Sequence, residues 1–122
     1  MSRMSDRYFS QPIPQIDVEE LALLLASTTE GLQLLDVREP SEVAQAYIEG
    51  FQVLPLSEFA AWSEQIPLRL DSNAETIVIC HHGIRSAQMC QWLINQGFTN
   101  VKNVVGGIDA YSRVVDPAIP RY

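Results

Sequence analysis

The sequence predicts an α/β fold in which a central parallel sheet carries helices on both faces. The strongest strand pattern covers residues 76–80, and the strongest helix pattern covers residues 86–96. A second strand pattern follows at residues 101–105, and a last short helix is expected over residues 108–115. A strand, a helix and a strand within about thirty residues form a βαβ unit, so these two strands should be parallel.

Helix and strand patterns also alternate in the first part of the chain. Residues 1–15 are polar and are expected to form a partly flexible lead-in. Asp17 is placed to cap a helix whose third residue is Glu20, and leucines then repeat at helical spacing up to Ser27. Residues 32–37 form an apolar run of the length expected for a buried strand. This alternation is typical of α/β domains.

Shorter elements continue the alternation in the middle of the chain. Pro40 begins a second helical pattern that ends at Gly50, and residues 51–54 follow as a strand. Residues 57–66 indicate a short helix. Residues 67–73 contain turn-forming residues and are expected to be a connecting loop before the βαβ unit.

The composition is that of one globular domain. With 122 residues, 47% of them hydrophobic and 19% charged, residues 16–122 are expected to form a single domain. A net charge of -7 repels a phosphate backbone, so nucleic acid is not an expected partner. No apolar run approaches the roughly 20 residues that span a bilayer, and residues 1–14 do not resemble a signal peptide. No membrane association is expected, the expected location is the cytoplasm, and nothing indicates an oligomeric state.

Two segments far apart in the sequence are expected to meet. Cys80 ends the strongest strand pattern, and Asp36 and Arg38 end the first buried strand. In open parallel sheets the ligand crevice lies beyond the carboxyl ends of the strands. Asp36 and Arg38 are therefore candidates for shaping a pocket around Cys80, although an ordinary ion pair at the end of a strand is an alternative.

The loop that starts at Cys80 has the features of a site for a reactive thiol. A thiolate is favoured at a helix N-terminus and beside cationic groups. If the loop curls over the start of the helix at Ser86, backbone N–H groups point inward, and Gly83 lets the chain turn. Arg85 offers five N–H donors for an oxyanion. The adjacent side chains at residues 81–82 are histidines, whose charge changes near neutral pH.

The two cysteines also suit other roles. Cys80 also suits the end of a buried strand as a small apolar residue, but the helix start, Gly83 and Arg85 favour the reactive thiol. Cys90 lies on an apolar helix face and is expected in the core. A disulfide is not expected in a reducing cytosol. No metal is expected, because successive residues rarely supply converging zinc ligands and the sequence has no second cluster of cysteines or histidines.

The chain is similar to the rhodanese family of sulfurtransferase domains from residue 17 to residue 111. The resemblance is carried, in the order of the family, by "LLDVREPSE", "YIEGFQVLPL", "IVICHHGIRSAQ" and "VVGGIDAY". It implies a central parallel sheet, no cofactor, and a cysteine, here Cys80, that takes up sulfane sulfur as a persulfide. The residues that the resemblance places around the sulfur donor are His81, His82, Gly83, Ile84, Arg85 and Ser86. Asp36 and Arg38 occupy the Asp-x-Arg segment that supports this pocket.

Loop length distinguishes two chemistries of this fold. Four residues separate Cys80 from Arg85, whereas the related phosphatases and arsenate reductases use five. A shorter loop favours a sulfur atom over a tetrahedral oxyanion. The expected partners are a small donor such as thiosulfate, or a persulfide donor protein, and a thiol acceptor. A phosphatase or arsenate reductase, and a non-catalytic binding module, are the alternatives. Tyr47, Phe51 and Tyr111 depart from the residues common in the family.

Overall fold

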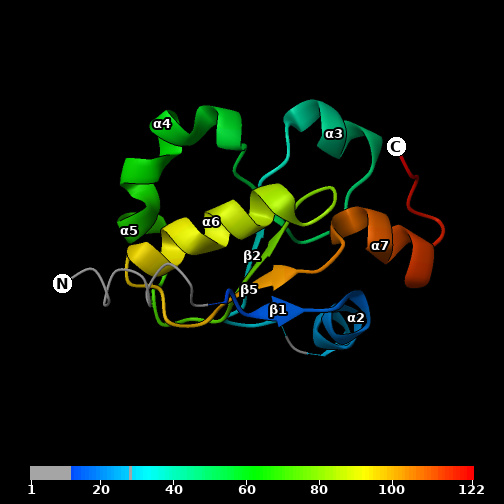
Figure 1. Cartoon of the computed structure of the whole chain (residues 1–122), viewed down its shortest axis with the longest axis horizontal. Helices are drawn as coiled ribbons and strands as arrows, with labels where there is room; N and C mark the ends of the chain where they lie inside the picture. The colour runs from blue at the N-terminus through cyan, green and yellow to red at the C-terminus, as the bar shows by residue number, and fades with distance from the viewer. Residues whose placement is uncertain (1–11, 28) are drawn as a thin grey trace.

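The protein is built on a single parallel sheet. We describe residues 12–27 and 29–122 in a computed structural model (Figure 1). Within these residues the sheet has five strands in the order β1-β5-β4-β2-β3, and every pairing is parallel. The strands are β1 (Gln15–Ile16), β2 (Gln33–Asp36), β3 (Gln52–Val53), β4 (Thr76–Ile79) and β5 (Val101–Val104). The predicted fold class is therefore confirmed.

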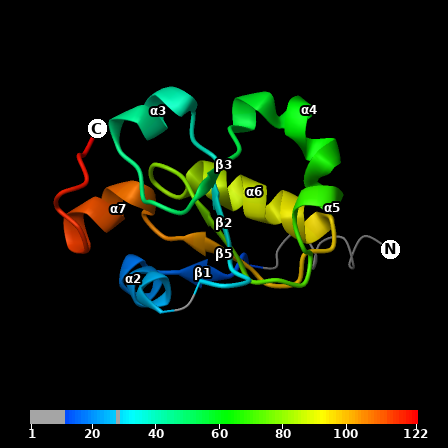
Figure 2. The ribbon, with the colours of Figure 1, turned by 180° about the vertical axis from the view of Figure 1, so that it is seen from behind.

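Helices cover both faces of this sheet, as Figures 1 and 2 show from opposite sides. They are α2 (Val18–Ala26), α3 (Pro40–Gln45), α4 (Phe59–Trp62), α5 (Ile66–Arg69), α6 (Ile84–Asn95) and α7 (Gly107–Val114). Short 3-10 turns at Leu56–Glu58 and Ser63–Gln65 flank α4. No helix among the described residues is long and apolar enough to cross a membrane.

The core consists of two layers, one on each side of the sheet. Val78 packs in the layer under α4, α5 and α6, whereas Ile77 and Ile79 pack in the layer under α2 and α7. This division follows from the alternation of side chains along a strand. Burial of β4 on both faces explains why its sequence is a continuous apolar run.

Several predicted boundaries agree with the structure. Asp17 caps α2 in a capping box with Glu20, and the helix ends at Ala26. The βαβ unit formed by β4, α6 and β5 has its two strands side by side and parallel, as predicted. Helix α7 starts one residue before its predicted start.

Other boundaries differ from the prediction for local physical reasons. Gln15 belongs to β1, because the backbone N–H of Asn103 donates to the carbonyl oxygen of Pro14 and extends the sheet by one short strand. The remainder of the predicted lead-in up to residue 11 lies outside the described residues. The helix expected over residues 57–66 is a broken series of short turns. Residues 67–69, which were expected to begin a loop, belong to helix α5. Pro67 is compatible with this helix because it lies in the first turn, where proline is tolerated.

Candidate active site

The sulfur of Cys80 lies between the end of β4 and the start of α6. It accepts hydrogen bonds from the backbone N–H of Gly83, with an N to Sγ distance of 3.1 Å, and from the hydroxyl of Ser86 at 3.2 Å. The positive end of the α6 dipole lies at the same place. Only 2% of the surface of Cys80 is exposed. The sulfur is therefore enclosed and is faced by donors.

Helix α6 begins at Ile84, two residues before its predicted start. Gly83 is the residue that precedes the helix, and its φ of 99° lies in the left-handed region that favours glycine. The turn from the strand into the helix is consequently tighter than predicted. Ile84 and Arg85 lie in the first helical turn, where backbone N–H groups have no partner within the helix. Ile84 is largely exposed and Ser86 is buried.

Helix α7 holds the reactive loop from the other side. The backbone N–H of Ile108 donates to the carbonyl oxygen of Cys80 at 2.9 Å, and the N–H of Asp109 donates to the carbonyl oxygen of His81 at 3.1 Å. Gly107 makes this approach feasible, because a Cβ at that position would overlap both of these carbonyl oxygens. The loop carbonyls are thus bound to α7, and the N–H of Gly83 is left to face the sulfur.

Arg85 is held by an acidic residue of α3. Its Nη2 lies 2.9 Å from Oε2 of Glu42, and its Nη1 donates to the other carboxylate oxygen. The hydrogen bond from Arg85 lowers the pKa of Glu42 to about 2, against the opposing effect of burial. The same bond raises the pKa of Arg85. Glu42 was not among the predicted site residues.

Asp36 and Arg38 form an ion pair that is almost completely buried. Nη2 of Arg38 lies 2.7 Å from Oδ2 of Asp36 and 2.8 Å from the carbonyl oxygen of Ala46. Burial alone would lower the pKa of Arg38, but the hydrogen bonds with Asp36 and Tyr122 outweigh it and raise the pKa. No contact recorded among the described residues joins this pair to the sulfur. Its connection to the loop runs through Tyr122 and α3.

Tyr122 links the buried pair to the loop. Its hydroxyl accepts from Nη1 of Arg38 at 2.8 Å and donates to Oε2 of Glu42 at 2.9 Å. Its ring stacks on the ring of His81, with centroids 3.9 Å apart and planes at 6°. No local sequence pattern indicates this role, because Tyr122 stands 84 positions from Arg38 and follows an irregular segment.

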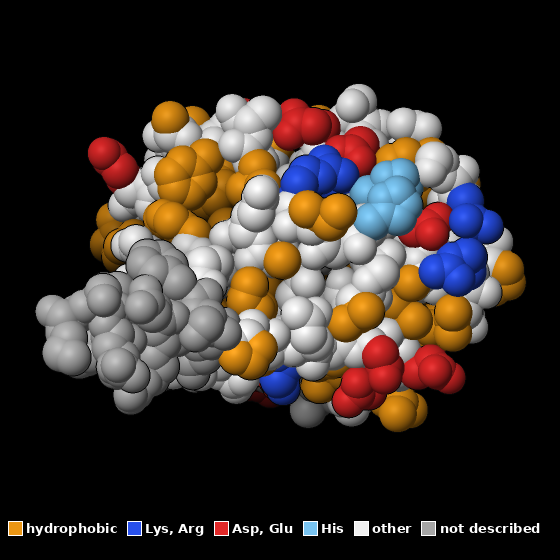
Figure 3. Space-filling view, in the orientation of Figure 1, with side chains coloured by type: hydrophobic (Ala, Val, Ile, Leu, Met, Phe, Trp, Pro, Cys, Tyr) orange, Lys and Arg blue, Asp and Glu red, His pale blue; other side chains and the backbone are white. Residues whose placement is uncertain are grey.

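The rings of the two loop histidines lie against each other at a tilt of 32°. The ring centroids of His81 and His82 are 3.9 Å apart, and Nε2 of His81 is buried with no hydrogen-bond partner. Burial, followed by the charge of His82, lowers the pKa of His81. Figure 3 shows the histidine surface with basic and acidic side chains on both sides of it.

The same region brings together three groups that are able to ligate a cation, although no sequence pattern predicts this combination. The ligand atoms of His81, His82 and Asp109 lie within 4.8 Å of one another. However, the carboxylate of Asp109 already accepts from Nε of Arg121 at 3.0 Å and from Nε of Arg113 at 3.3 Å. Two cations therefore compete with a metal for this carboxylate.

Cys90 lies in the core, as predicted. It is fully buried in the layer under α6, and it does not form a disulfide with Cys80. Burial raises the pKa of its thiol to about 12, so this thiol stays protonated at neutral pH. Of the two cysteines, only Cys80 has hydrogen-bond donors directed at its sulfur among the described residues.

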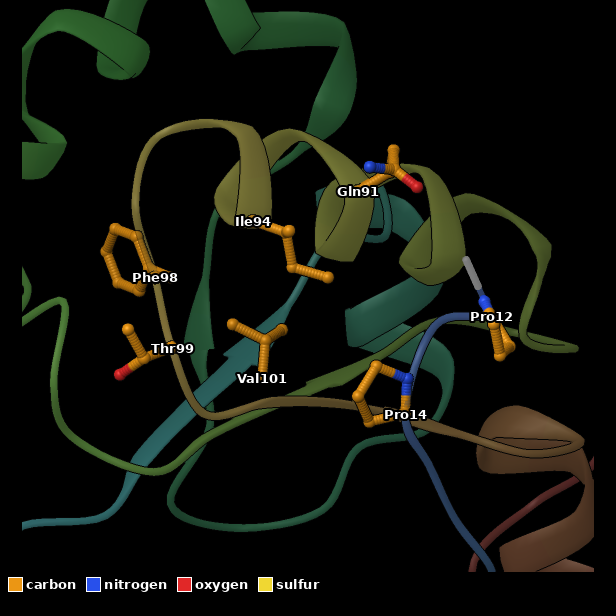
Figure 4. A pocket seen from close by; sticks show the side chains of 7 residues that line it. All are labelled: Pro12, Pro14, Gln91, Ile94, Phe98, Thr99 and Val101. Atoms are coloured by element: carbon orange, nitrogen blue, oxygen red, sulfur yellow. The ribbon is translucent and has the colours of Figure 1, made fainter. Parts of the chain in front are cut away.

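A separate cavity lies beside the second half of α6. Figure 4 shows Ile94 of α6 and Val101 of β5 among its lining side chains. The remaining lining residues are Pro12, Pro14, Gln91, Phe98 and Thr99. The lining contains no cysteine, histidine or charged residue. This cavity therefore offers no thiol nucleophile or titratable group.

Comparison with known proteins agrees with this geometry. Residues 17–113 match the model of the rhodanese-like domain. The chain is 44% identical over 114 residues to the rhodanese-like/PpiC domain-containing protein 12, chloroplastic, of Arabidopsis thaliana, covering 92% of this chain but only 38% of that relative. It is 36% identical over 101 residues to a sulfurtransferase of Allochromatium vinosum, covering 83% of this chain and 90% of the relative.

Solved structures give the same assignment. A rhodanese-related protein from Thermoplasma volcanium superposes with a TM-score of 0.69 at 28% identity, covering 89% of this chain and 99% of that one. A rhodanese-like domain protein from Staphylococcus aureus gives a TM-score of 0.71 at 25% identity, with 89% and 98% covered. From its sequence, its fold and the loop around Cys80, the chain belongs to the family of rhodanese-like domains.

Proposed function

We propose that the protein is a sulfurtransferase that carries sulfane sulfur as a persulfide on Cys80. The observation that carries this proposal is the pair of donors on the sulfur, the N–H of Gly83 and the hydroxyl of Ser86, at the N-terminus of α6. Such donors stabilise a sulfur anion, and a thiolate is the nucleophile in sulfur transfer. The sulfurtransferase from Allochromatium vinosum, which shares most of its length with this chain, supports the same activity.

The reaction proceeds in two displacements. In the first, the thiolate of Cys80 attacks the outer sulfur of thiosulfate, a new S–S bond forms, and the S–S bond of thiosulfate breaks with its electron pair leaving on sulfite. In the second, a thiolate acceptor, or cyanide in an assay, attacks the terminal sulfur of the persulfide. The electron pair of that S–S bond returns to Cys80 as the thiolate. Ping-pong kinetics follow from this sequence.

The surroundings of the loop suit a small anionic donor. Arg85 keeps about a third of its side chain exposed, and the N–H groups that do not bind Glu42 are free to meet the sulfonate of thiosulfate. His82, three positions before Arg85 in the sequence, is exposed as well. Because Cys80 is enclosed, a whole donor molecule does not fit beside its sulfur. The donor therefore reacts through a terminal sulfur atom that extends to Cys80. The loop of four residues between Cys80 and Arg85 supports sulfur rather than phosphate as the transferred group.

Mass spectrometry of the intact protein tests the proposal. Incubation with thiosulfate, or with a small persulfide, is expected to add the mass of one sulfur atom. Cys80→Ser should abolish this adduct, and Cys90→Ser is the matched control that should retain it. An unchanged mass with both donors would count against sulfur transfer. Robust turnover of an aryl phosphate would instead support the phosphatase alternative.

A further inference from the structure

Asn103 places a buried amide beside the reactive loop. It lies in β5 between Val78 of β4 and Gln15 of β1, and 4% of its surface is exposed. Side chains alternate along a strand, so Asn103 faces the same side of the sheet as Val101, which packs in the layer under α6. A buried amide destabilises a fold unless it is hydrogen-bonded. The partners of Asn103 therefore indicate its role.

Both ends of the Asn103 amide bind groups that surround Cys80. Its Nδ2 donates to the carbonyl oxygen of Gly83 at 3.1 Å and to Oε1 of Gln15 at 3.2 Å. A carbonyl oxygen only accepts, so the nitrogen must face Gly83 and the oxygen must face Ser86. The hydroxyl of Ser86 donates to Oδ1 of Asn103. One side chain thus contacts both residues that donate to the sulfur.

The hydroxyl of Ser86 lies between two acceptors but carries one hydrogen. Its oxygen is 3.2 Å from Sγ of Cys80 and is also bonded to Asn103. While Cys80 is a thiol, its S–H donates to the Ser86 oxygen, and Ser86 donates to Asn103. When the thiol releases its proton to solvent, the negative charge on the sulfur attracts the Ser86 hydrogen, because bonds to charged acceptors are the stronger ones.

We propose that Asn103 is a positioning residue for the Cys80 sulfur. It fixes Gly83 and Ser86 as donors, and the hydrogen of Ser86 turns between Asn103 and the sulfur as the charge on the sulfur changes. The significance for turnover rests on the proposed function. The inner sulfur is anionic before attack on the donor, neutral in the persulfide and anionic again after transfer. The Ser86 hydrogen therefore points to the sulfur in the anionic states and to Asn103 in the neutral state, and it stays bonded to the serine oxygen throughout.

The alkylation of Cys80 by iodoacetamide as a function of pH tests this inference. In Asn103→Leu the residues that donate to the sulfur lose the side chain that positions them. The rate at neutral pH is expected to fall about tenfold, because a misplaced donor weakens its hydrogen bond to the charged sulfur, and the profile should move to higher pH. Ser86→Ala should act in the same direction. Because Asn103 acts in part through Ser86, the double variant should react faster than the product of the two single effects predicts.

Gln15→Leu is the matched control. It removes another hydrogen bond of the Asn103 amide without touching the sulfur donors, so its alkylation profile should equal that of the unmodified protein. Asn103→Thr, whose side chain suits a strand, provides the same test if Asn103→Leu does not fold. An unchanged profile in the folded Asn103 variant, or fully additive effects in the double variant, would overturn the inference. Alkylation needs no sulfane sulfur, so this result is independent of whether the protein transfers sulfur.

Discussion

Arg85 and Glu42 form a two-point ion pair that joins the first turn of α6 to α3, across 43 positions of sequence. Glu42 also accepts a hydrogen bond from Tyr122, and Tyr122 accepts one from the buried Arg38. The guanidinium beside the reactive loop is therefore oriented by a chain of contacts that ends in the buried ion pair of Arg38 and Asp36. In the proposed reaction this orientation directs the free N–H groups of Arg85 toward the donor.

Replacing Glu42 should reduce activity more than stability. In Glu42→Gln the anchor of Arg85 is weakened, and kcat/KM for thiosulfate is expected to fall by about tenfold to a hundredfold, as expected for a misplaced binding group. The free energy of unfolding should fall by about 1–2 kcal/mol, since Glu42 loses hydrogen bonds to a charged partner but the ion pair is partly exposed.

Glu75→Gln is the control for this change. Glu75 pairs with Lys102 at 2.7 Å, and the side chains in that pair are 30% and 34% exposed, but the pair lies away from the loop. This variant should lose less than about 1 kcal/mol of stability, since exposed ion pairs contribute little, and it should retain its activity. Equal kcat/KM in the two variants would show that Glu42 does not position Arg85.

The same carboxylate should contribute to stability in acid. The pKa of Glu42 is about 2 in the folded protein, below its ordinary value of 4.5. A group with a depressed folded pKa stabilises the fold fully above its unfolded pKa and loses this contribution as the pH falls to the folded pKa. The difference in unfolding free energy between the protein and Glu42→Gln, measured in urea, should be constant above about pH 4.5 and shrink toward pH 2. A difference that stays constant down to pH 2 would show that the ionised Glu42 carboxylate does not stabilise the fold.

The elements that the sequence predicted well are those with strong local patterns. The β4, α6 and β5 segments each carry a strong local pattern, and the capping box of α2 is a local contact between Asp17 and Glu20. Strand β1 was missed because it has two residues and is defined by pairing with β5, which no local pattern encodes. The predicted start of α6 is two residues late because Ile84 and Arg85, expected in the loop, already form the first helical turn after Gly83.

The candidate site was predictable at Cys80 and its loop, but its supporting residues depend on long-range contacts. Glu42 and Tyr122 come from segments whose sequence patterns concern only their own local structure. Asn103 did carry a usable signal: it is a polar residue at a position of the β5 pattern that alternation turns toward the core. A buried polar residue in a strand requires partners, and the adjacent reactive loop provides them.

The hydroxyl of Tyr122 should stabilise the fold. Tyr122→Phe keeps the stacking on His81 but removes the acceptor for Arg38 and the donor to Glu42. A loss of about 1–2 kcal/mol in unfolding free energy is expected, because hydrogen bonds to charged groups are among the stronger ones. Tyr47→Phe is the control, since Tyr47 is 61% exposed and its change should be within about 0.5 kcal/mol. Equal stability in the two variants would remove Tyr122 from the supporting network.

Gly107 should be essential for the shape of the reactive loop. A Cβ at this position would overlap the carbonyl oxygens of Cys80 and His81, and its φ of 61° is also unfavourable for other residues. Gly107→Ala should therefore lose at least about 3 kcal/mol of stability, and Cys80 should lose its ordered donors. Differential scanning calorimetry and the iodoacetamide profile of Cys80 measure the two effects.

Gly97→Ala separates backbone strain from this overlap. Gly97 has a φ of 99° but no atom within 4 Å of the added Cβ, so its substitution introduces strain alone. It should cost about 1–2 kcal/mol and leave the alkylation of Cys80 unchanged. If Gly107→Ala behaved like Gly97→Ala in both measurements, the contact of α7 with the loop carbonyls would not determine the shape of the loop. The direction of the Gly83 N–H toward the sulfur would then not depend on α7. If only Gly107→Ala alters the alkylation profile, the close approach of α7 to the backbone of residues 80–81 maintains the donor arrangement at the sulfur.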